Sequence, residues 1–175
     1  SDVCSSDLTQ QSAYEDVIQL FGKSQRILTP TISGGGVREL FEKDASLKTD
    51  PRFTLYPQWI QRRIAAGQYS FGVDPRGGNG KMLLDVQKAG ALVVAGTDTP
   101  NAFNLHGEIM SYVMAGMSTF DALKTATVNP AKALAVNTGT IEPGKLADII
   151  AIDGDPIANI ASTYKVRKVV ANGRV

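Results

Sequence analysis

The sequence predicts an α/β protein with parallel strands, followed by a β-rich C-terminal segment. Residues 91–96, ALVVAG, form an apolar run without polar alternation, which is typical of a strand covered on both faces. Residues 26–33, RILTPTIS, indicate an earlier strand, and helical patterns precede, separate and follow the two runs. Beyond residue 140, turn signals and short apolar runs replace the helical periodicity.

The first elements follow from local patterns. Residues 12–22, SAYEDVIQLFG, place apolar side chains on one helical face, and Gly22 is expected to end this helix. The strand at 26–33 is expected to close at Pro30 and at the glycine run 34–36, which we interpret as a loop. Residues 37–44, VRELFEKD, predict a short helix.

The middle of the chain predicts two helices separated by a loop. Residues 50–67 indicate a loop and then a helix, with Pro57 at its first position and Gly67 beyond its end. Residues 72–80, GVDPRGGNG, are loop-like in composition. Residues 81–90, KMLLDVQKAG, predict a helix that ends at the final glycine and leads into the apolar strand.

Three helices are expected after the apolar strand. Residues 106–116, HGEIMSYVMAG, are helical in pattern, and Ser118 with Asp121 forms a capping box for the next helix. Asn129 is expected to cap the third helix, with Pro130 at its first position.

The C-terminal segment predicts short strands joined by turns. Within 140–156, TIEPGKLADIIAIDGDP, a Pro143–Gly144 turn separates two strand candidates. Near the end, Asn172–Gly173 is the residue pair best suited to a type I′ hairpin turn.

Composition limits the function classes. The chain has 175 residues, of which 43% are hydrophobic and 20% charged, and its formal net charge is +1, so we expect a globular domain and no binding to nucleic acid. No apolar run is long enough for a transmembrane segment. One Cys and one His exclude an internal disulfide and a zinc site of three or four N/S ligands from this chain alone. The cellular compartment stays open.

Residues 1–8, SDVCSSDL, have neither a basic n-region nor an apolar h-region, so they do not form a signal peptide. They resemble a translated sequencing adapter. We therefore expect an artefactual, non-native N-terminus and exclude it from the prediction of the fold.

Asp98 and His106 are the first candidates for chemistry. Asp98 lies just beyond the carboxyl end of the predicted buried strand, where α/β sheets and barrels place ligands and catalytic groups. The alternative is a solvated turn or cap residue. His106 stands near a helix start, where a structural donor or a surface residue is the alternative to a functional group. Glu108 is explained by the helix dipole.

Residues 90–175 resemble the C-terminal part of metal-dependent amidohydrolases, especially the imidazolonepropionase-like and prolidase-like branch. The motifs that carry the resemblance are GTD at 96–98, HGE at 106–108, NPAKAL at 129–134 and PGKLADI at 143–149. The resemblance implies a (β/α)₈ TIM-type barrel with a small β-sandwich. Residues 9–138 would then be the C-terminal part of the barrel, with its last two strands and their helices, and residues 139–175 the C-terminal strands of the sandwich.

The same resemblance implies a mechanism. Such enzymes use one or two divalent metal ions, usually zinc, to hydrolyse C–N bonds in amides, cyclic amides or dipeptides. Asp98 would contact the metal and serve as acid and base, Thr97 and Thr99 would flank and orient it, and His106 would lie behind the ligands or at the entrance. The other metal ligands would come from strands absent from this chain.

The resemblance therefore predicts an incomplete fragment, inactive alone, whose partners are its own missing N-terminal half and a small-molecule amide or peptide substrate. Two alternatives stay open: a complete, non-catalytic α/β binding or scaffold domain, and a degenerate, metal-free relative. Assembly into a homo-oligomer is also open. A set of aromatic and basic side chains is interpreted as amphipathic helix surface rather than as a pocket wall: Arg52, Tyr56, Trp59, Arg62 and Arg63.

Overall fold

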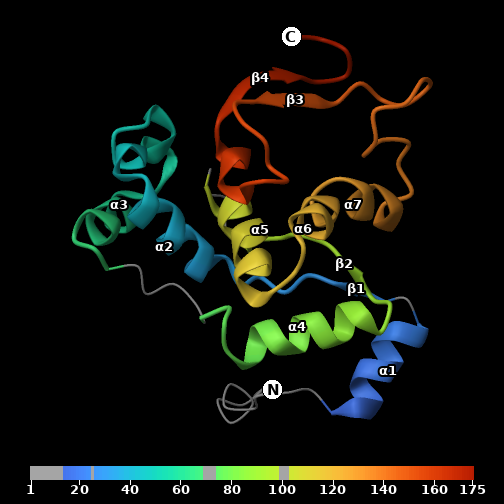
Figure 1. The fold of residues 1–175 in the computed structure, drawn as a ribbon. Coiled ribbons are helices and arrows are strands. Elements are labelled where there is room, and N and C mark those ends of the chain that lie inside the picture. Colours follow the sequence, from blue (N-terminus) through green and yellow to red (C-terminus); the bar gives the residue numbers. More distant parts are fainter. Residues whose placement is uncertain (1–13, 25, 69–73, 99–102) are drawn as a thin grey trace.

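The computed structural model describes residues 14–24, 26–68, 74–98 and 103–175. It has helices around a small parallel sheet and a separate antiparallel hairpin (Figure 1). In chain order, the elements are α1 (Glu15–Lys23), β1 (Ile27–Leu28), α2 (Ser33–Lys43), the 3-10 helices η2 (Ala45–Lys48) and η3 (Pro51–Leu55), α3 (Gln58–Ala65), α4 (Gly78–Lys88), β2 (Leu92–Val93), α5 (Asn104–Ala115), α6 (Thr119–Thr125), α7 (Val128–Ala133), β3 (Ile149–Ile152), η4 (Ile160–Tyr164) and β4 (Val166–Val170).

The two expected strands pair in parallel, which confirms the α/β fold class. Ile27 lies opposite Leu92 in the register of β1 and β2. The backbone N–H of Leu92 donates to the Arg26 carbonyl at 3.2 Å, and that of Val94 donates to the Leu28 carbonyl at 2.9 Å. Because parallel strands end at the same edge of their sheet, the segments that follow β1 and β2 leave from one side.

The other edge of β2 is tied to the helices that follow it. The Asn129 side-chain amide donates to the Val93 carbonyl at 2.7 Å, and the Ala95 backbone N–H donates to the Thr125 carbonyl at 2.9 Å. The prediction that Asn129 caps α7 is therefore wrong. Thr127 holds the cap position, and Asn129 lies inside the helix because its side chain satisfies a strand carbonyl instead.

Helices α2 and α5 approach so closely that only glycine fits between them. A Cβ atom on Gly36 would lie 1.9 Å from the Gly107 carbonyl oxygen, and one on Gly107 would lie 2.3 Å from Val37 Cγ2. The prediction of a loop at 34–36 is wrong for this reason. The glycines lie in the first turn of α2, where tertiary contact outweighs their low helix propensity.

Gly22 is also a position where close packing requires glycine. It was expected to end the first helix, but α1 continues to Lys23. A Cβ atom at Gly22 would lie 2.0 Å from the Ala89 carbonyl oxygen at the end of α4. The glycine therefore serves close packing of α1 against α4 rather than helix termination.

An aromatic cluster fills the core between α2, η3 and α5. Phe41 makes edge contacts with Phe53 and Phe103 at centroid distances of 5.7 and 5.6 Å, and Tyr56 stacks on Phe103 at 6.1 Å. The buried Tyr56 hydroxyl donates to the Asn104 side-chain oxygen at 3.1 Å. This cluster fixes the N-terminal end of α5 against the segment that follows α2.

The C-terminal segment forms an antiparallel pair, β3 with β4, at the opposite end of the molecule from α1 (Figure 1). The turn at Asn172–Gly173 is confirmed, since both residues have positive φ angles of 49° and 74° as a type I′ turn requires. Residues 140–142 form no strand, because no described segment pairs with them. The capping box is confirmed by a 3.0 Å bond from the Asp121 backbone N–H to Ser118 Oγ.

In the described ranges, no helix has the length and apolar character needed to cross a bilayer.

Replacing Gly36 with Ala should destabilise the fold, because the new methyl group would overlap backbone atoms of α5 that cannot move separately. We expect a loss of about 2–3 kcal/mol in the free energy of unfolding of the full-length protein, measured by urea denaturation. Gly67→Ala is the control. Its Cβ meets nothing within 4 Å, and only its positive φ opposes substitution, at about 1 kcal/mol. Equal losses in both variants would contradict close helix packing.

Candidate active site

The candidate site lies at the sheet edge where both parallel strands end. Asp98 follows the last residue of β2 by five positions, its side chain is exposed, and its φ of 51° lies in the left-handed region that Asp tolerates better than most residues. The segment after β1 lies close by, since a Cβ atom on Gly96 would come within 2.4 Å of Thr29 Cγ2. Asp98 thus lies two residues beyond the point where the segments that follow the two strands approach each other.

The two threonines that flank Asp98 stay a prediction. Thr97 is half-buried on the β2 side of the bend. Thr99 lies outside the described residues.

His106 is half-buried in the first turn of α5 and faces η4. Its Nδ1 lies 3.2 Å from Thr163 Oγ1, which makes a hydrogen bond between the helix and the C-terminal segment. Burial, together with the nearby Arg52 cation, lowers the pKa of His106 to about 4. The imidazole is therefore neutral at pH 7, with one ring nitrogen that donates a hydrogen bond and one that accepts.

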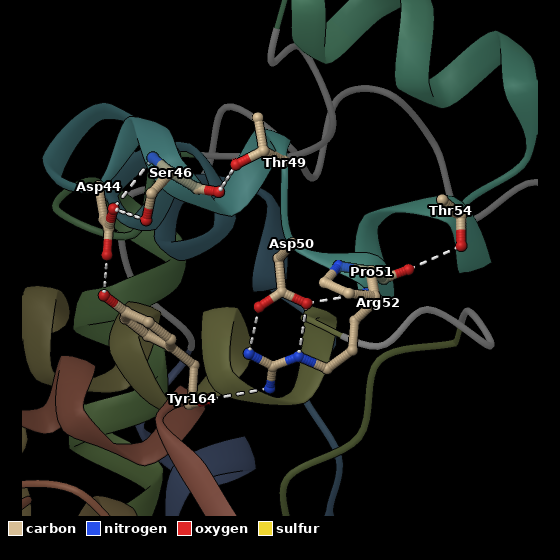
Figure 2. A network of polar contacts seen from close by, with 8 residues as sticks. All are labelled: Asp44, Ser46, Thr49, Asp50, Pro51, Arg52, Thr54 and Tyr164. Atoms are coloured by element: carbon tan, nitrogen blue, oxygen red, sulfur yellow. Dashed lines mark hydrogen bonds and ion pairs between the residues drawn. The ribbon is translucent and has the colours of Figure 1, made fainter.

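Arg52 makes three side-chain hydrogen bonds to neighbouring groups (Figure 2). Its Nε and Nη2 donate to the two Asp50 carboxylate oxygens at 2.9 and 2.7 Å, and its Nη1 donates to the Tyr164 carbonyl at 2.8 Å. The Tyr164 hydroxyl in turn donates to Asp44. The network joins η2 and η3 to η4. The interpretation of Tyr56 as amphipathic helix surface is wrong, because Tyr56 is buried just beyond η3, whereas Arg52 is partly exposed within that helix.

Glu108 is completely buried in α5, beneath this edge. Its Oε1 accepts the Ile32 backbone N–H at 3.0 Å. Neither Glu108 Oε2 nor the Tyr112 hydroxyl has a hydrogen-bond partner among the described residues. The pKa of Tyr112 is raised mainly by burial and further by the nearby Glu108 carboxylate. Burial raises the pKa of Glu108 to about 7, while the neighbouring Tyr112 hydroxyl and the backbone N–H groups of Ile32 and Thr31 oppose that rise.

The explanation of Glu108 by the helix dipole is wrong. Glu108 is the fifth residue of α5, the first turn contains no acidic residue, and the carboxyl group points at the backbone after β1. In the sequence, only the HGE motif drew attention to Glu108, and the motif does not indicate which group Glu108 bonds to. The partner is 76 residues away.

Nowhere in the described residues do three or more His, Cys, Asp or Glu side chains gather in a way that could hold a metal ion. The groups present therefore do not fit a complete metal site by themselves, and Asp98 is the one candidate ligand that the sequence singled out.

Residues 72–175 match the sequence profile described as Amidohydrolase family. The chain belongs to the amidohydrolase family. The match covers α4, β2 and everything that follows, so it includes Asp98, His106 and Glu108. The prediction of family membership is thereby confirmed.

Two curated proteins are similar to parts of this amidohydrolase chain. An adenine deaminase from Methanosphaera stadtmanae is 40% identical over 58 residues, which are 33% of this chain and 10% of the deaminase. A 5-methylthioadenosine/S-adenosylhomocysteine deaminase from Thermoanaerobacter pseudethanolicus is 34% identical over 114 residues, covering 50% of this chain and 26% of the relative. The chain thus spans about a quarter or less of these relatives.

Solved structures resemble nearly the whole chain. A Xaa-Pro dipeptidase with bound methionine in the active site aligns with a TM-score of 0.63 and 25% identity over 91% of this chain and 36% of its own. Molinate hydrolase aligns with a TM-score of 0.61 and 20% identity over 93% of this chain and 35% of its own, which shows a shared fold. This amidohydrolase chain therefore shares its α/β fold with about a third of each of these larger proteins.

Glu108 should make the stability of the amidohydrolase depend on pH. Its pKa is higher in the folded state than its ordinary value of 4.5, so the folded protein holds the proton longer than the unfolded chain. Its contribution is fully present below the unfolded pKa and is lost as pH rises toward 7.

Glu108→Gln removes this titration. We expect the free energy of unfolding of the variant, relative to wild type, to rise by about 2–3 kcal/mol between about pH 5 and about pH 8. Urea denaturation of the full-length protein at the two pH values measures it. A difference that stays constant with pH would contradict a pKa near 7.

Proposed function

We propose that this chain supplies the last two strands of a (β/α)₈ barrel, with their helices, in a metal-dependent amidohydrolase that hydrolyses C–N bonds. The observation that carries the proposal is the position of Asp98, beyond the carboxyl end of β2 and two residues after Gly96, which lies against Thr29 in the segment that follows β1. In barrels of this type, catalytic groups stand at that end of the strands. The parallel pairing and the resemblance to larger hydrolases support it.

Asp98 acts as the acid and base in this proposal. An exposed carboxylate at a strand end can take a proton from an attacking water and pass it to the leaving nitrogen. Enzymes of the family generally use a divalent metal, which supplies an activated water when bound. The described residues do not form a metal site, so the remaining ligands would come from other strands of the full-length protein, and zinc is our proposed ion.

The exposed apolar surface beside the C-terminal hairpin supports the inference that another segment covers it. A groove of about 500 Å³ runs between α7 and the start of β3, and its apolar lining includes Leu134, Ile141 and Ile150. These side chains are 74%, 85% and 56% exposed. A two-stranded sheet is marginal alone. We infer that strands from the N-terminal half of the full-length protein cover this hairpin and complete a small β-sandwich.

The substrate class is a small molecule with a hydrolysable C–N bond. The resemblance to a Xaa-Pro dipeptidase and to deaminases of adenine and of S-adenosylhomocysteine supports this class, and the first favours the prolidase-like branch. Three of the five N–H donors of the Arg52 side chain already bond to Asp50 and Tyr164, so we assign Arg52 to this network rather than to a substrate carboxylate. A Xaa-Pro dipeptide, adenine and S-adenosylhomocysteine therefore make a first panel of test substrates.

Asp98→Ala in the full-length protein should lower kcat on the hydrolysed member of the panel by about 100-fold or more, because the proton carrier is removed. Asp98→Asn, which keeps the size but cannot carry the proton, should do the same. Asp74→Ala is the matched control, since Asp74 is also exposed in a turn. Steady-state kinetics and circular dichroism check the result. Near-normal turnover in a folded Asp98 variant would end the proposed role.

Residues 9–175 alone, supplied with zinc, should hydrolyse the panel no faster than the uncatalysed reaction. This chain offers Asp98 but no group of three ligands in its described residues, so a metal ion would not be held for catalysis. Product release measured by chromatography tests this. Metal-dependent hydrolysis above background would refute the idea that further strands are needed, and it would favour a complete domain.

A further inference from the structure

Two side chains of α5 reach across to the backbone at the start of α2. Glu108 Oε1 accepts the Ile32 N–H at 3.0 Å, and one turn further on, Ser111 Oγ accepts the Gly36 N–H at 2.9 Å. Glu108 and Ser111 are both 0% exposed. These bonds are possible because Gly36 and Gly107 let the two helices touch.

The start of α2 lacks a capping side chain of its own. Ile32 occupies the cap position with an apolar side chain that forms no capping hydrogen bond. A helix N-terminus leaves backbone N–H groups unsatisfied and favours a negative or acceptor group. Glu108 supplies that acceptor from another helix, in a place that water does not reach.

The residue before Ile32 is strained. Thr31 has a φ of 54°, in the left-handed region that β-branched residues rarely adopt. Such a conformation persists only where the surroundings hold it. Thr31 belongs to the segment that leaves β1 at the same sheet edge as Asp98, and Thr29 in that segment lies beside Gly96.

We propose that Glu108 is a positioning residue that holds Ile32, and through it the strained Thr31 turn, at the strand edge that carries Asp98. The effect on the turn follows from the hydrogen bond alone. The effect on catalysis rests on the function proposed above for Asp98. In this proposal Glu108 does not touch the reacting groups. It fixes the backbone at Thr31 and Ile32, which belongs to the same sheet edge.

Residue-resolved amide hydrogen exchange on the full-length protein tests the effect on the turn. In Glu108→Ala, the Ile32 amide should exchange about tenfold faster or more, while the Gly36 amide keeps its rate. Ser111→Ala is the matched control from the same helix pair, and it should speed Gly36 and leave Ile32 unchanged. Unchanged exchange at Ile32 in folded Glu108→Ala overturns the proposal.

The conservative variant separates positioning from general damage. Glu108→Gln keeps a carbonyl oxygen that can accept the Ile32 N–H, so Ile32 should remain protected to within about threefold of wild type. Loss of protection in Glu108→Gln equal to that in Glu108→Ala would overturn the proposal. If Glu108→Ala does not fold, Glu108→Asp replaces it, because the carboxyl group is then one methylene too short. Unchanged Ile32 exchange in Glu108→Asp would also overturn it.

Kinetics on the same variants test the effect on catalysis. With the Xaa-Pro dipeptide, adenine and S-adenosylhomocysteine as probes, Glu108→Ala should lower kcat by about tenfold with little change in KM, and Glu108→Gln should restore most of it. Faster Ile32 exchange with unchanged kcat would contradict the proposed effect of the Thr31 turn on catalysis. If wild type hydrolyses none of the probes, the proposed function fails on this panel, while the exchange data still decide the role of Glu108 in the turn.

Discussion

The contact between α2 and α5 is the constraint on which the rest of the described structure depends. Two glycines face each other there, and neither tolerates a Cβ atom without a clash against the other helix. Packing at backbone distance makes short side chains effective, so Ser111 can reach the Gly36 N–H and Glu108 can reach Ile32. A larger separation would leave these buried groups unsatisfied, at a cost of about 1–3 kcal/mol each.

Helix α5 also fixes the other surroundings of the candidate site. Its first turn contributes Asn104, which accepts the Tyr56 hydroxyl bond, and His106, which meets Thr163. Phe103, just before the helix, lies under the Arg52 guanidinium, 4.9 Å from ring centroid to Cζ. Asp98 is separated from Phe103 by only four residues of sequence. The helix that holds the β1 end therefore also limits where the chain beyond β2 can go.

Local signals in the sequence were sufficient for the features that depend on near neighbours. The apolar run at 91–96 and the earlier run at 26–33 identified the parallel pair, Ser118 with Asp121 identified a helix start, and Asn172–Gly173 identified a turn. These local sequence patterns did not predict the structure where the deciding contact comes from a residue far away in the chain. The run 34–36 is helical because α5 lies against it, and Asn129 and Glu108 serve backbone groups that are far away in the sequence. Pattern alone names no such partner.

The two acidic residues of this region show how environment assigns roles. Glu108 has no exposed surface, so burial favours its neutral form and its value lies in holding a backbone N–H. Asp98 is exposed on a backbone with positive φ beyond the strand end, so its side chain is accessible to solvent and to a reactant. With the two environments exchanged, a buried Asp98 would be out of reach of a reactant, and an exposed Glu108 would leave Ile32 without its acceptor. Only nine residues of sequence, 99–107, separate these two contrasting environments.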